Sequence, residues 1–304
     1  RLLSNYNFPG KSKKNIQHHY DIGGGKGEKL YDIFLDKKHR QYSCAYFKTK
    51  NDILETAQQN KIDHIIAKLN IKPGNKVLDI GCGWGGMVFE IAKQKQCKVV
   101  GVSLSKNQIN YCKKKAQELN LDSMVSFQLA DYRSLKGKYD RVVSVGMFEH
   151  IGKKFYKTFF NKLNELLKED GIILLHTIGS VGKPTPPAPF IQKYIFPGGI
   201  VPSFSEILKP IEKTGLIVSD TETLIRHYDK TLDKWLARFV KKKSEIQDMF
   251  DEKFVRMWEF YLASCASAFK YRDLVVFQLQ LVKNFNSIPS NRRDYIYSSN
   301  LYTK

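Results

Sequence analysis

Cysteine is scarce in this sequence, and its spacing fits neither a metal site nor a disulfide framework. The 304 residues contain five cysteines, at positions 44, 82, 97, 112 and 265, and no two of them form a CxxC pair. An odd count without paired spacing supports neither a zinc ribbon nor a disulfide-stapled domain, so no metal is expected. Free thiols of this kind are typical of a reduced, cytosolic compartment.

Long apolar runs are also lacking. No stretch approaches the roughly 20 consecutive apolar residues that a membrane-spanning helix needs. The first residues lack the apolar core of a signal peptide. We therefore expect a chain that is soluble or that contacts a membrane from one side. Because the sequence begins with Arg1 rather than Met, we also expect it to be cut from a longer chain.

Acidic residues are too few to balance the basic ones. There are 50 Lys and Arg against 30 Asp and Glu, which gives a formal net charge of +20. Such a charge predicts an acidic partner, either nucleic acid or an anionic membrane surface. Hydrophobic residues make up 42% of the chain and aromatic residues 12%, a composition that excludes a disordered chain.

Short apolar runs alternate with helical patterns between residues 76 and 178. This alternation predicts a parallel sheet with helices on both faces and ligands bound at the carboxyl ends of its strands. An amphipathic helix is expected before it at 52–69, begun by a capping box of Asp52 and Glu55 and ended before Pro73. The strands are expected at 76–80, 98–102, 125–129, 141–145 and 172–178, and the helices at about 84–95, 105–119 and 154–168.

The regions that flank this alternation break its pattern. Four prolines between residues 184 and 189 exclude a helix or a central strand and predict a loop over the site. Strands at 216–225 and 274–282, with helices at about 229–247 and 251–270, complete a doubly wound, mostly parallel α/β sheet of seven strands. The expected division is an N-terminal helical cap with an active-site segment (1–60), a catalytic domain (61–283) with a lid inserted at about 180–215, and a frayed tail (284–304).

A glycine-rich loop follows the first expected strand. Gly81, Gly83, Gly85 and Gly86 stand between that strand and a helix, where glycines let the backbone approach a nucleotide-like ligand closely. A nicotinamide-binding fold would need an acid about 20 residues further on. The second strand instead continues as GVSLSKNQ, without an acid. A turn that serves only to pack the strand against the helix is the alternative.

Asp79 stands just before these glycines. A carboxylate there would repel a pyrophosphate and attract an ammonium or sulfonium group, which favours S-adenosylmethionine over a dinucleotide. Neutral hydrogen bonds to the ribose are expected from Ser103, Ser105 and Gln108. The third strand is followed by an acid and an aromatic ring that can hold and cover adenine or can serve packing alone, Asp131 and Tyr132.

Several stretches, taken together and in this order, resemble the cyclopropane-fatty-acyl-phospholipid synthase family, which includes the mycolic acid cyclopropane synthases. They are HHYDIGG (18–24), QYSCAYF (41–47), VLDIGCGWGG (77–86), GVSLSKNQ (101–108), SVGMFEHIG (144–152), LLHTIGS (174–180), YIFPGGIVPS (194–203), HYDKTLDKW (227–235) and YLASCASAF (261–269). The resemblance implies the S-adenosylmethionine-dependent methyltransferase fold. It also implies a reaction that adds the cofactor's methyl carbon across a cis double bond of a lipid acyl chain.

The resemblance further implies a bound bicarbonate, the base that removes a proton from the transferred methyl so that a cyclopropane ring closes. Cys265 matches another cysteine treated as an active-site residue, although its SCASA spacing suits helix packing equally well. The residues alone leave other roles open for the matched positions: a buried thiol, a salt bridge, a core histidine and a half-buried tyrosine. The positions that match the bicarbonate holders are Cys44, Glu149, His176, the Ile178 backbone and Tyr228.

For the cofactor, the resemblance implies residues at the methionine end, in the glycine loop and after the second and third strands. Aromatic residues in FIQKYIFPGG and WEFYLAS are expected to line the acyl channel, with ordinary core packing as the alternative. The implied cofactor residues are Tyr42, Ser43, Asp79, Gly81, Gly83, Gly85, Ser103, Leu104, Gln108, Asp131 and Tyr132.

The basic charge then points to anionic lipid headgroups, with KSKK (11–14) and KKK (241–243) as candidate contacts. We expect a cytoplasmic enzyme, bound peripherally at the inner membrane surface, that acts on unsaturated phospholipid and binds no nucleic acid. A homodimer stays open, as does an N-terminal domain that some longer family members carry. The alternatives are a methyl-branched or methylene product, a binding protein without catalysis, and an RNA methyltransferase, for which no RNA-recognition signature is present.

Overall fold

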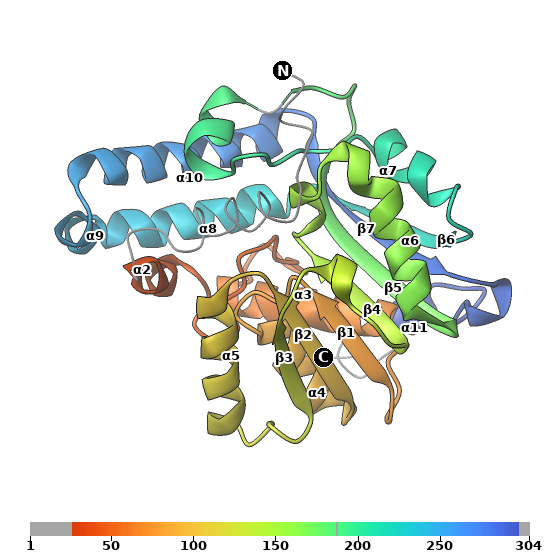
Figure 1. Cartoon of the computed structure of the whole chain (residues 1–304). Helices are drawn as coiled ribbons and strands as arrows, with labels where there is room; N and C mark the ends of the chain where they lie inside the picture. The colour runs from red at the N-terminus through yellow and green to blue at the C-terminus, as the bar shows by residue number, and fades with distance from the viewer. Residues whose placement is uncertain (1–25, 187, 298–304) are drawn as a thin grey trace.

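The computed structural model describes residues 26–186 and 188–297, which fold around one seven-stranded sheet (Figure 1). The strand order is β3-β2-β1-β4-β5-β7-β6. Neighbours among β1 to β5 pair in parallel, whereas β7 runs antiparallel to both β5 and β6. This confirms the expected sheet. The strands are β1 Lys76–Ile80, β2 Lys98–Ser103, β3 Val125–Leu129, β4 Tyr139–Val145, β5 Leu167–Ser180, β6 Ile217–Leu224 and β7 Leu274–Val282.

Helices cover both faces of the sheet, so its central strands are apolar on both sides. Val77 of β1 packs among the residues of three helices, whereas the next residue, Leu78, packs among those of two others. The helices on the Val77 side are α3 Leu54–Lys68, α4 Gly86–Lys95 and α5 Lys106–Glu118, and those on the Leu78 side are α6 Tyr156–Leu166 and α7 Phe204–Ile211.

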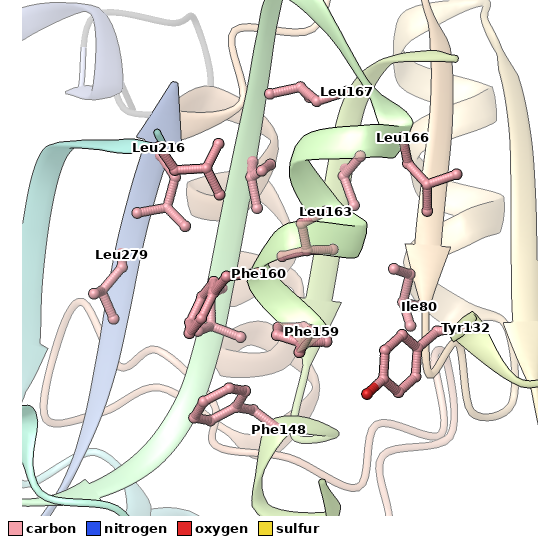
Figure 2. Packing of buried hydrophobic residues seen from close by; sticks show 14 of the residues in the cluster. Ile80, Tyr132, Phe148, Phe159, Phe160, Leu163, Leu166, Leu167, Leu216 and Leu279 are labelled. Atoms are coloured by element: carbon pink, nitrogen blue, oxygen red, sulfur yellow. The ribbon is translucent and has the colours of Figure 1, made fainter. Parts of the chain in front are cut away.

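α6 shows how sequence spacing builds this layer. Its buried residues recur every three or four positions, which gives the helix one apolar stripe. Phe159, Phe160 and Leu163 of that stripe are fully buried and lie between the helix and the sheet (Figure 2). Burying one such side chain contributes about 1.5–3 kcal/mol. The stripe therefore fixes the helix against β4 and β5, which carry part of the site.

A third core lies to one side of the sheet and is built from helices. α8 and α10 run side by side, and α2 lies next to α8 (Figure 1). Trp235 of α8 and Trp258 of α10 are fully buried here with Phe34 of α2. This core joins α2, from the segment where a cap is expected, to helices from later in the chain. Its helices are α2 Lys26–Phe34, α8 Tyr228–Lys241, α9 Lys243–Met249 and α10 Glu252–Tyr271.

The start of α3 differs from the expectation. No capping box forms at Asp52 and Glu55, because the helix begins one residue later, after Ile53. The carboxylate of Asp52 instead accepts the backbone N–H groups of Lys48 and Thr49, at 2.8 Å and 3.3 Å, and so closes the preceding turn. A capping box does form at the start of α7, between Ser203 and Glu206.

The lid and the tail are more ordered than the sequence suggests. The expected loop at 180–215 contains a single π-helical turn, Ile191–Ile195, and then α7. The tail folds into a short helix, α11 Asp294–Tyr297, so the expectation of fraying is wrong up to residue 297. Ile296 is fully buried there, and Arg293 pairs with Asp220 of β6 at 3.0 Å. KSKK (11–14) and HHYDIGG (18–24) lie outside the described residues.

Two features are absent from the part of the chain that the structure describes. None of its helices combines the length and the apolar character required to span a membrane. Nor do three or more His, Cys, Asp or Glu side chains within it come together as they would around a metal ion.

Candidate active site

Two pockets meet at the carboxyl edge of the parallel strands. The first, the glycine-loop cleft, holds about 1130 Å³ of empty space that is partly open to solvent. The second, the apolar pocket, holds about 830 Å³ and is lined by residues of β5, the lid, α8 and α10. Both pockets are lined by the same four residues, which form their common wall: Tyr42, Ser43, Gly146 and His150.

The sheet register explains why residues distant in sequence come together here. Asp79, near the end of β1, pairs with Gly101 of β2, and Val145, the last residue of β4, pairs with His176 of β5. Parallel strands end at one edge, so the loops that follow them share one ligand-binding crevice. Glu149 lies in the loop that follows β4.

The glycine loop needs its glycines for two different reasons. Gly81 and Gly85 both have left-handed backbone conformations, with φ of 89° and 82°. A Cβ on Gly81 would stand 2.8 Å from the Cβ of Met147, so the loop can pass the cleft only without a side chain. Gly81 and Gly83 line the cleft, but Gly85 does not: it caps α4 and packs against Phe89.

Asp79 provides a buried carboxylate in the glycine-loop cleft. The residue is 2% exposed, and its Oδ1 atom has no hydrogen-bond partner among the described residues. Burial raises the pKa of this carboxyl to about 7, and attraction to the Lys61 ammonium opposes the rise. A cationic ligand beside Asp79 would favour the ionised form and would be held by it.

Ser103, Leu104 and Gln108 line the cleft after β2. The hydroxyl of Ser103 donates to the Gln108 side-chain oxygen at 2.8 Å, which fixes the amide and directs its NH₂ group away from that bond. Ser105 does not line the cleft. It is fully buried and accepts the Gln108 backbone N–H at 3.3 Å as the N-cap of α5, so its expected contact with a ribose is not supported.

Asp131 and Tyr132 also line the cleft, but both have structural partners. Burial acts to raise the pKa of Asp131, yet hydrogen bonds from Arg133 outweigh it and hold that pKa below its usual value. The pair is bidentate, with distances of 2.8 Å and 2.6 Å. Tyr132 packs edge-on against Phe159 of α6, 5.3 Å between ring centroids (Figure 2). The ring therefore belongs to the core and to the cleft wall at once.

All six residues expected at the reacting centre line the apolar pocket: Cys44, Glu149, His176, Ile178, Tyr228 and Cys265. Glu149 is its acidic member. Its Oε1 accepts the Ile178 backbone N–H at 2.6 Å, and its buried Oε2 has no partner among the described residues. Burial raises the pKa of Glu149 to about 7, and the bond from Ile178 moderates the rise. The Ile178 amide is thus engaged by Glu149 rather than directed freely into the pocket.

His176 is held in one tautomer. Its Nδ1 lies 3.1 Å from the amide nitrogen of Gln278 on β7. An amide NH₂ only donates, so Nδ1 is the acceptor and the ring proton sits on Nε2. Burial, assisted by the nearby Lys61 charge, lowers the pKa of His176 well below its usual value. The imidazole is neutral and offers one N–H.

The remaining polar groups of the apolar pocket are also neutral. Burial raises the pKa of the Cys44 thiol far above neutrality and that of Cys265 to about 12. It likewise raises the pKa of Tyr228 well above its usual value. Both thiols are therefore protonated near neutral pH, and neither is a thiolate nucleophile. The pocket therefore offers neutral donors around one carboxyl group, which suits an anion held near an apolar substrate.

Known proteins are similar to this chain in sequence. A sequence profile of the family described as "Mycolic acid cyclopropane synthetase" matches residues 9–279. The chain is 42% identical to the cyclopropane-fatty-acyl-phospholipid synthase of Escherichia coli (strain K12), over 90% of this chain and 69% of that protein. It is 34% identical to cyclopropane mycolic acid synthase MmaA2 of Mycobacterium tuberculosis (strain ATCC 25618 / H37Rv), over 89% of this chain and 97% of that protein. The chain belongs to this family.

Solved structures of family members agree with the fold. The cyclopropane synthase MmaA2 from Mycobacterium tuberculosis superposes with a TM-score of 0.83 at 33% identity and covers 88% of this chain and 97% of its own. Mycolic acid cyclopropane synthase CmaA1, complexed with SAH and CTAB, gives 0.82 with the same identity and coverage. Family membership makes this protein an S-adenosylmethionine-dependent methyltransferase.

The segment around Tyr42 and Ser43, which forms the wall between the two pockets, is held in place by residues that sequence reasoning missed. Gln58 and Lys61 lie one turn apart on α3, and both are fully buried. Gln58 donates to the Ser43 carbonyl at 2.9 Å, and the Lys61 ammonium donates to the Ser43 hydroxyl at 2.9 Å and to the Gln41 side-chain oxygen. On the other side, the Ala45 N–H donates to Thr231 of α8 at 3.0 Å.

His150 is a third missed residue, since it lines both pockets. Burial lowers its pKa to about 4, so the ring is neutral. It lies 5.7 Å from the ring of Phe196 in the lid, measured between centroids. The sequence offered a signal for His150, the residue after Glu149 in MFEH, but none for Lys61, which is one of several buried polar residues on α3.

Proposed function

We propose that this enzyme transfers the methyl carbon of S-adenosylmethionine to a cis double bond of an unsaturated phospholipid acyl chain and closes a cyclopropane ring, with bicarbonate as the base. One observation carries the proposal. The glycine-loop cleft and the apolar pocket adjoin across Tyr42 and Ser43, and the six residues matched to the reacting centre all line the apolar side. A methyl donor in one pocket and an alkene in the other can therefore meet at this wall.

The residues of the cleft fit a sulfonium cofactor. S-adenosylmethionine, when bound, supplies an electrophilic methyl group. Asp79, with its unpartnered Oδ1, would attract the cationic end of such a molecule. Ser103 and Gln108 offer neutral hydrogen bonds for a ribose, and Asp131 and Tyr132 lie where the third strand ends, on the wall of the same cleft.

The apolar pocket fits an alkene because most of its lining is apolar, and the reaction requires that the double bond be aligned with the methyl group and kept from water. An alkene has no acidic proton, so no base is needed before it attacks the methyl group. The two π electrons would form the new carbon–carbon bond as the methyl–sulfur bond breaks and its electron pair stays on sulfur, and one alkene carbon would become a carbocation. A base then takes a proton from the transferred methyl, and the electron pair of that C–H bond closes the ring. Aromatic rings of Phe196, Tyr261 and Phe269 line this pocket and would stabilise the cation.

The donor set fits a bicarbonate ion. Neutral donors are available from His176 Nε2 and Tyr228, and the same pocket is lined by Cys44, whose thiol donates to the Ala45 carbonyl at 3.3 Å. Glu149 has a buried, unpartnered Oε2 that would accept the O–H of bicarbonate and orient the ion. The thiols and the phenol are protonated, and His176 uses Nδ1 to accept from Gln278, so none of these side chains is available as the base.

We further propose that the enzyme takes its substrate from an anionic membrane surface. Phe260 on α10 and Tyr194 in the lid are exposed, and Phe190 touches both, with ring centroids 4.8 Å and 5.5 Å away. Their neighbours in sequence, Phe196 and Tyr261, line the apolar pocket. The net charge of +20 favours anionic headgroups. Exposed aromatic side chains on the elements that wall the pocket are what an interfacial enzyme needs.

The test combines mass spectrometry and NMR of lipids after incubation with S-adenosylmethionine and phosphatidylglycerol vesicles that carry cis-unsaturated chains. A product one CH₂ heavier with cyclopropyl proton signals supports the proposal. The same mass with methylene or vinylic signals keeps the cofactor and the lipid but changes which proton is lost. Unchanged lipids in the presence of bound cofactor and added bicarbonate contradict the proposed reaction.

A further inference from the structure

Two buried side chains of opposite charge line the glycine-loop cleft, and only one of them has been given a role. Asp79 is the acidic one. The basic one is Arg40, which also lines the cleft and whose side chain is 8% exposed. Each of the two groups keeps one buried polar atom without a hydrogen-bond partner among the described residues: Oδ1 of Asp79 and Nε of Arg40. An unpaired donor and an unpaired acceptor in one cleft describe a site for a zwitterion.

The terminal nitrogens of Arg40 are already engaged. Nη2 pairs with Asp32 at 2.7 Å and donates to the Glu28 carbonyl at 3.0 Å, while Nη1 lies 3.5 Å from the Glu28 carboxylate. Both acidic residues lie on α2 and are about half exposed. These contacts hold the far end of the guanidinium toward α2. They leave Nε as the donor for a ligand.

Two aromatic rings fix the plane of the guanidinium. Its central carbon lies 4.4 Å from the ring centroid of Trp84, in the glycine loop, and 4.6 Å from that of Tyr111, on α5. Trp84 and Tyr111 contact each other edge-on, 5.3 Å between centroids. The side chain is therefore positioned before any ligand arrives, and its N–H direction is set by packing.

The backbone at Arg40 is also constrained. Arg40 adopts a left-handed conformation with φ of 49°, which is uncommon for a residue other than glycine. The Asp36 carboxylate holds the segment by accepting the N–H groups of His39 and Gln41, at 2.6 Å and 2.7 Å. A Cβ on Gly86 would stand 2.3 Å from the His39 carbonyl, so the segment lies directly against the start of α4.

We propose that Arg40 binds the α-carboxylate of S-adenosylmethionine through its Nε–H, so that Arg40 and Asp79 together recognise the charges of the methionine end. A carboxylate accepts this hydrogen bond with charge assistance, while Asp79 attracts the cationic end. The two partners are brought to the same cleft by the glycine loop and by the segment packed on α4. The inference takes its cofactor from the proposed function but is independent of the lipid acceptor.

The experiment measures cofactor binding by calorimetry, without lipid, for S-adenosylmethionine and for its decarboxylated form. The wild type should bind the carboxylated ligand more tightly. Arg40→Met should weaken that ligand about 10- to 100-fold and leave the decarboxylated one within about twofold, since a hydrogen bond to a charged group is lost only for the first. Equal losses for both ligands would mean that Arg40 only supports the cleft, and the inference would be wrong.

Two further variants keep the test independent of folding. Asp32→Asn removes the main ion pair to α2 but retains Arg40, so the preference for the carboxylated ligand should persist. Arg133→Met changes the other arginine of the same cleft, which pairs with Asp131, and should affect both ligands equally. A wild type that binds both ligands equally well overturns the inference and leaves the cofactor assignment intact. A wild type that binds neither contradicts both.

Discussion

The two pockets share a wall but differ in the charge of their polar groups. In the glycine-loop cleft, Asp79 and Arg40 are oppositely charged side chains with buried, unpartnered atoms. In the apolar pocket, Cys44, His176 and Tyr228 are neutral, and Glu149 is the only acidic residue among those that line it. The first arrangement suits a ligand that arrives charged. The second suits an apolar chain on which charge develops only during the reaction.

The comparison shows that burial serves a different purpose in each pocket, although it raises the pKa of the acidic groups in both. At Asp79, burial raises the carboxyl pKa to about 7, so that a cationic ligand is needed to favour its ionised form. At Cys44 and Tyr228, burial keeps the groups protonated, which preserves them as hydrogen-bond donors. Lys61 lies behind the shared wall and acts on both sides, since it attracts Asp79 and helps keep His176 neutral.

The largest effect is expected from Glu149→Gln. We expect turnover to fall at least about 100-fold, because the variant loses the carboxyl group that orients the base. Cofactor affinity should stay within about twofold, since Glu149 lines only the apolar pocket. Single-turnover kinetics with vesicles and calorimetry with S-adenosylmethionine separate the two quantities. A variant that retains the full rate would disprove the anion site.

Asp79→Asn should have the reverse effect of Glu149→Gln: it should weaken cofactor binding and leave the rate nearly unchanged. The amide keeps the size of the side chain but removes its charge, so we expect cofactor affinity to fall about 10- to 100-fold, in line with a charged hydrogen bond of about 1.5–3 kcal/mol. The rate at saturating cofactor should change much less. Loss of rate without loss of affinity would place Asp79 in catalysis instead.

The same residue predicts the pH dependence of cofactor binding. The pKa of Asp79 is about 7 in the free enzyme, so the carboxyl loses its charge as the pH falls below 7. Affinity should therefore fall by about tenfold per unit below pH 7. The Asp79→Asn variant should show a flat profile. A wild-type profile that is equally flat would show that Asp79 does not contact the cation.

Much of the fold could be predicted because it follows from local patterns. The apolar runs and the glycines after the first run indicate the sheet and the edge where ligands bind, and the strands at 76–80, 125–129 and 274–282 match in both bounds. Asp52 could not be assigned as easily. Its carboxylate can cap either a helix or a turn, and the choice depends on Lys48 and Thr49 lying within reach.

The site was predicted as a set of residues but not as a set of bonds. The six residues that the family motifs assign to the reacting centre all line one pocket. They did not reveal that the Ile178 amide is taken by Glu149, that Gln278 fixes the tautomer of His176, or that Lys61 supports the wall. These contacts join residues far apart in the chain, and periodicity carries no information about such pairs.

Gln278→Leu tests the neutral donors of the apolar pocket, because it changes the hydrogen bond to His176. Without the amide, Nδ1 of His176 loses its donor and the ring proton is no longer fixed on Nε2. We expect the rate to fall about five- to tenfold, roughly the worth of one hydrogen bond of about 1 kcal/mol, with cofactor affinity unchanged. Gln280→Leu is the matched control, because Gln280 lies two residues further along β7, is equally buried and lines neither pocket. An equal loss of rate in both variants would indicate a packing effect.

The smallest effect concerns how the apolar pocket receives its substrate. Phe260 is 57% exposed on α10, one residue before the pocket-lining Tyr261, so Phe260→Ser should weaken binding to phosphatidylglycerol vesicles about threefold, less than the roughly 1.5–3 kcal/mol of full burial. Val240→Ser, on α8 at 45% exposure, is the control and should bind like the wild type. Raising the salt concentration should weaken vesicle binding of the wild type and of both variants. If Phe260→Ser and Val240→Ser bind alike in vesicle sedimentation, the lipid does not enter beside α10, and the pocket must be filled from another face.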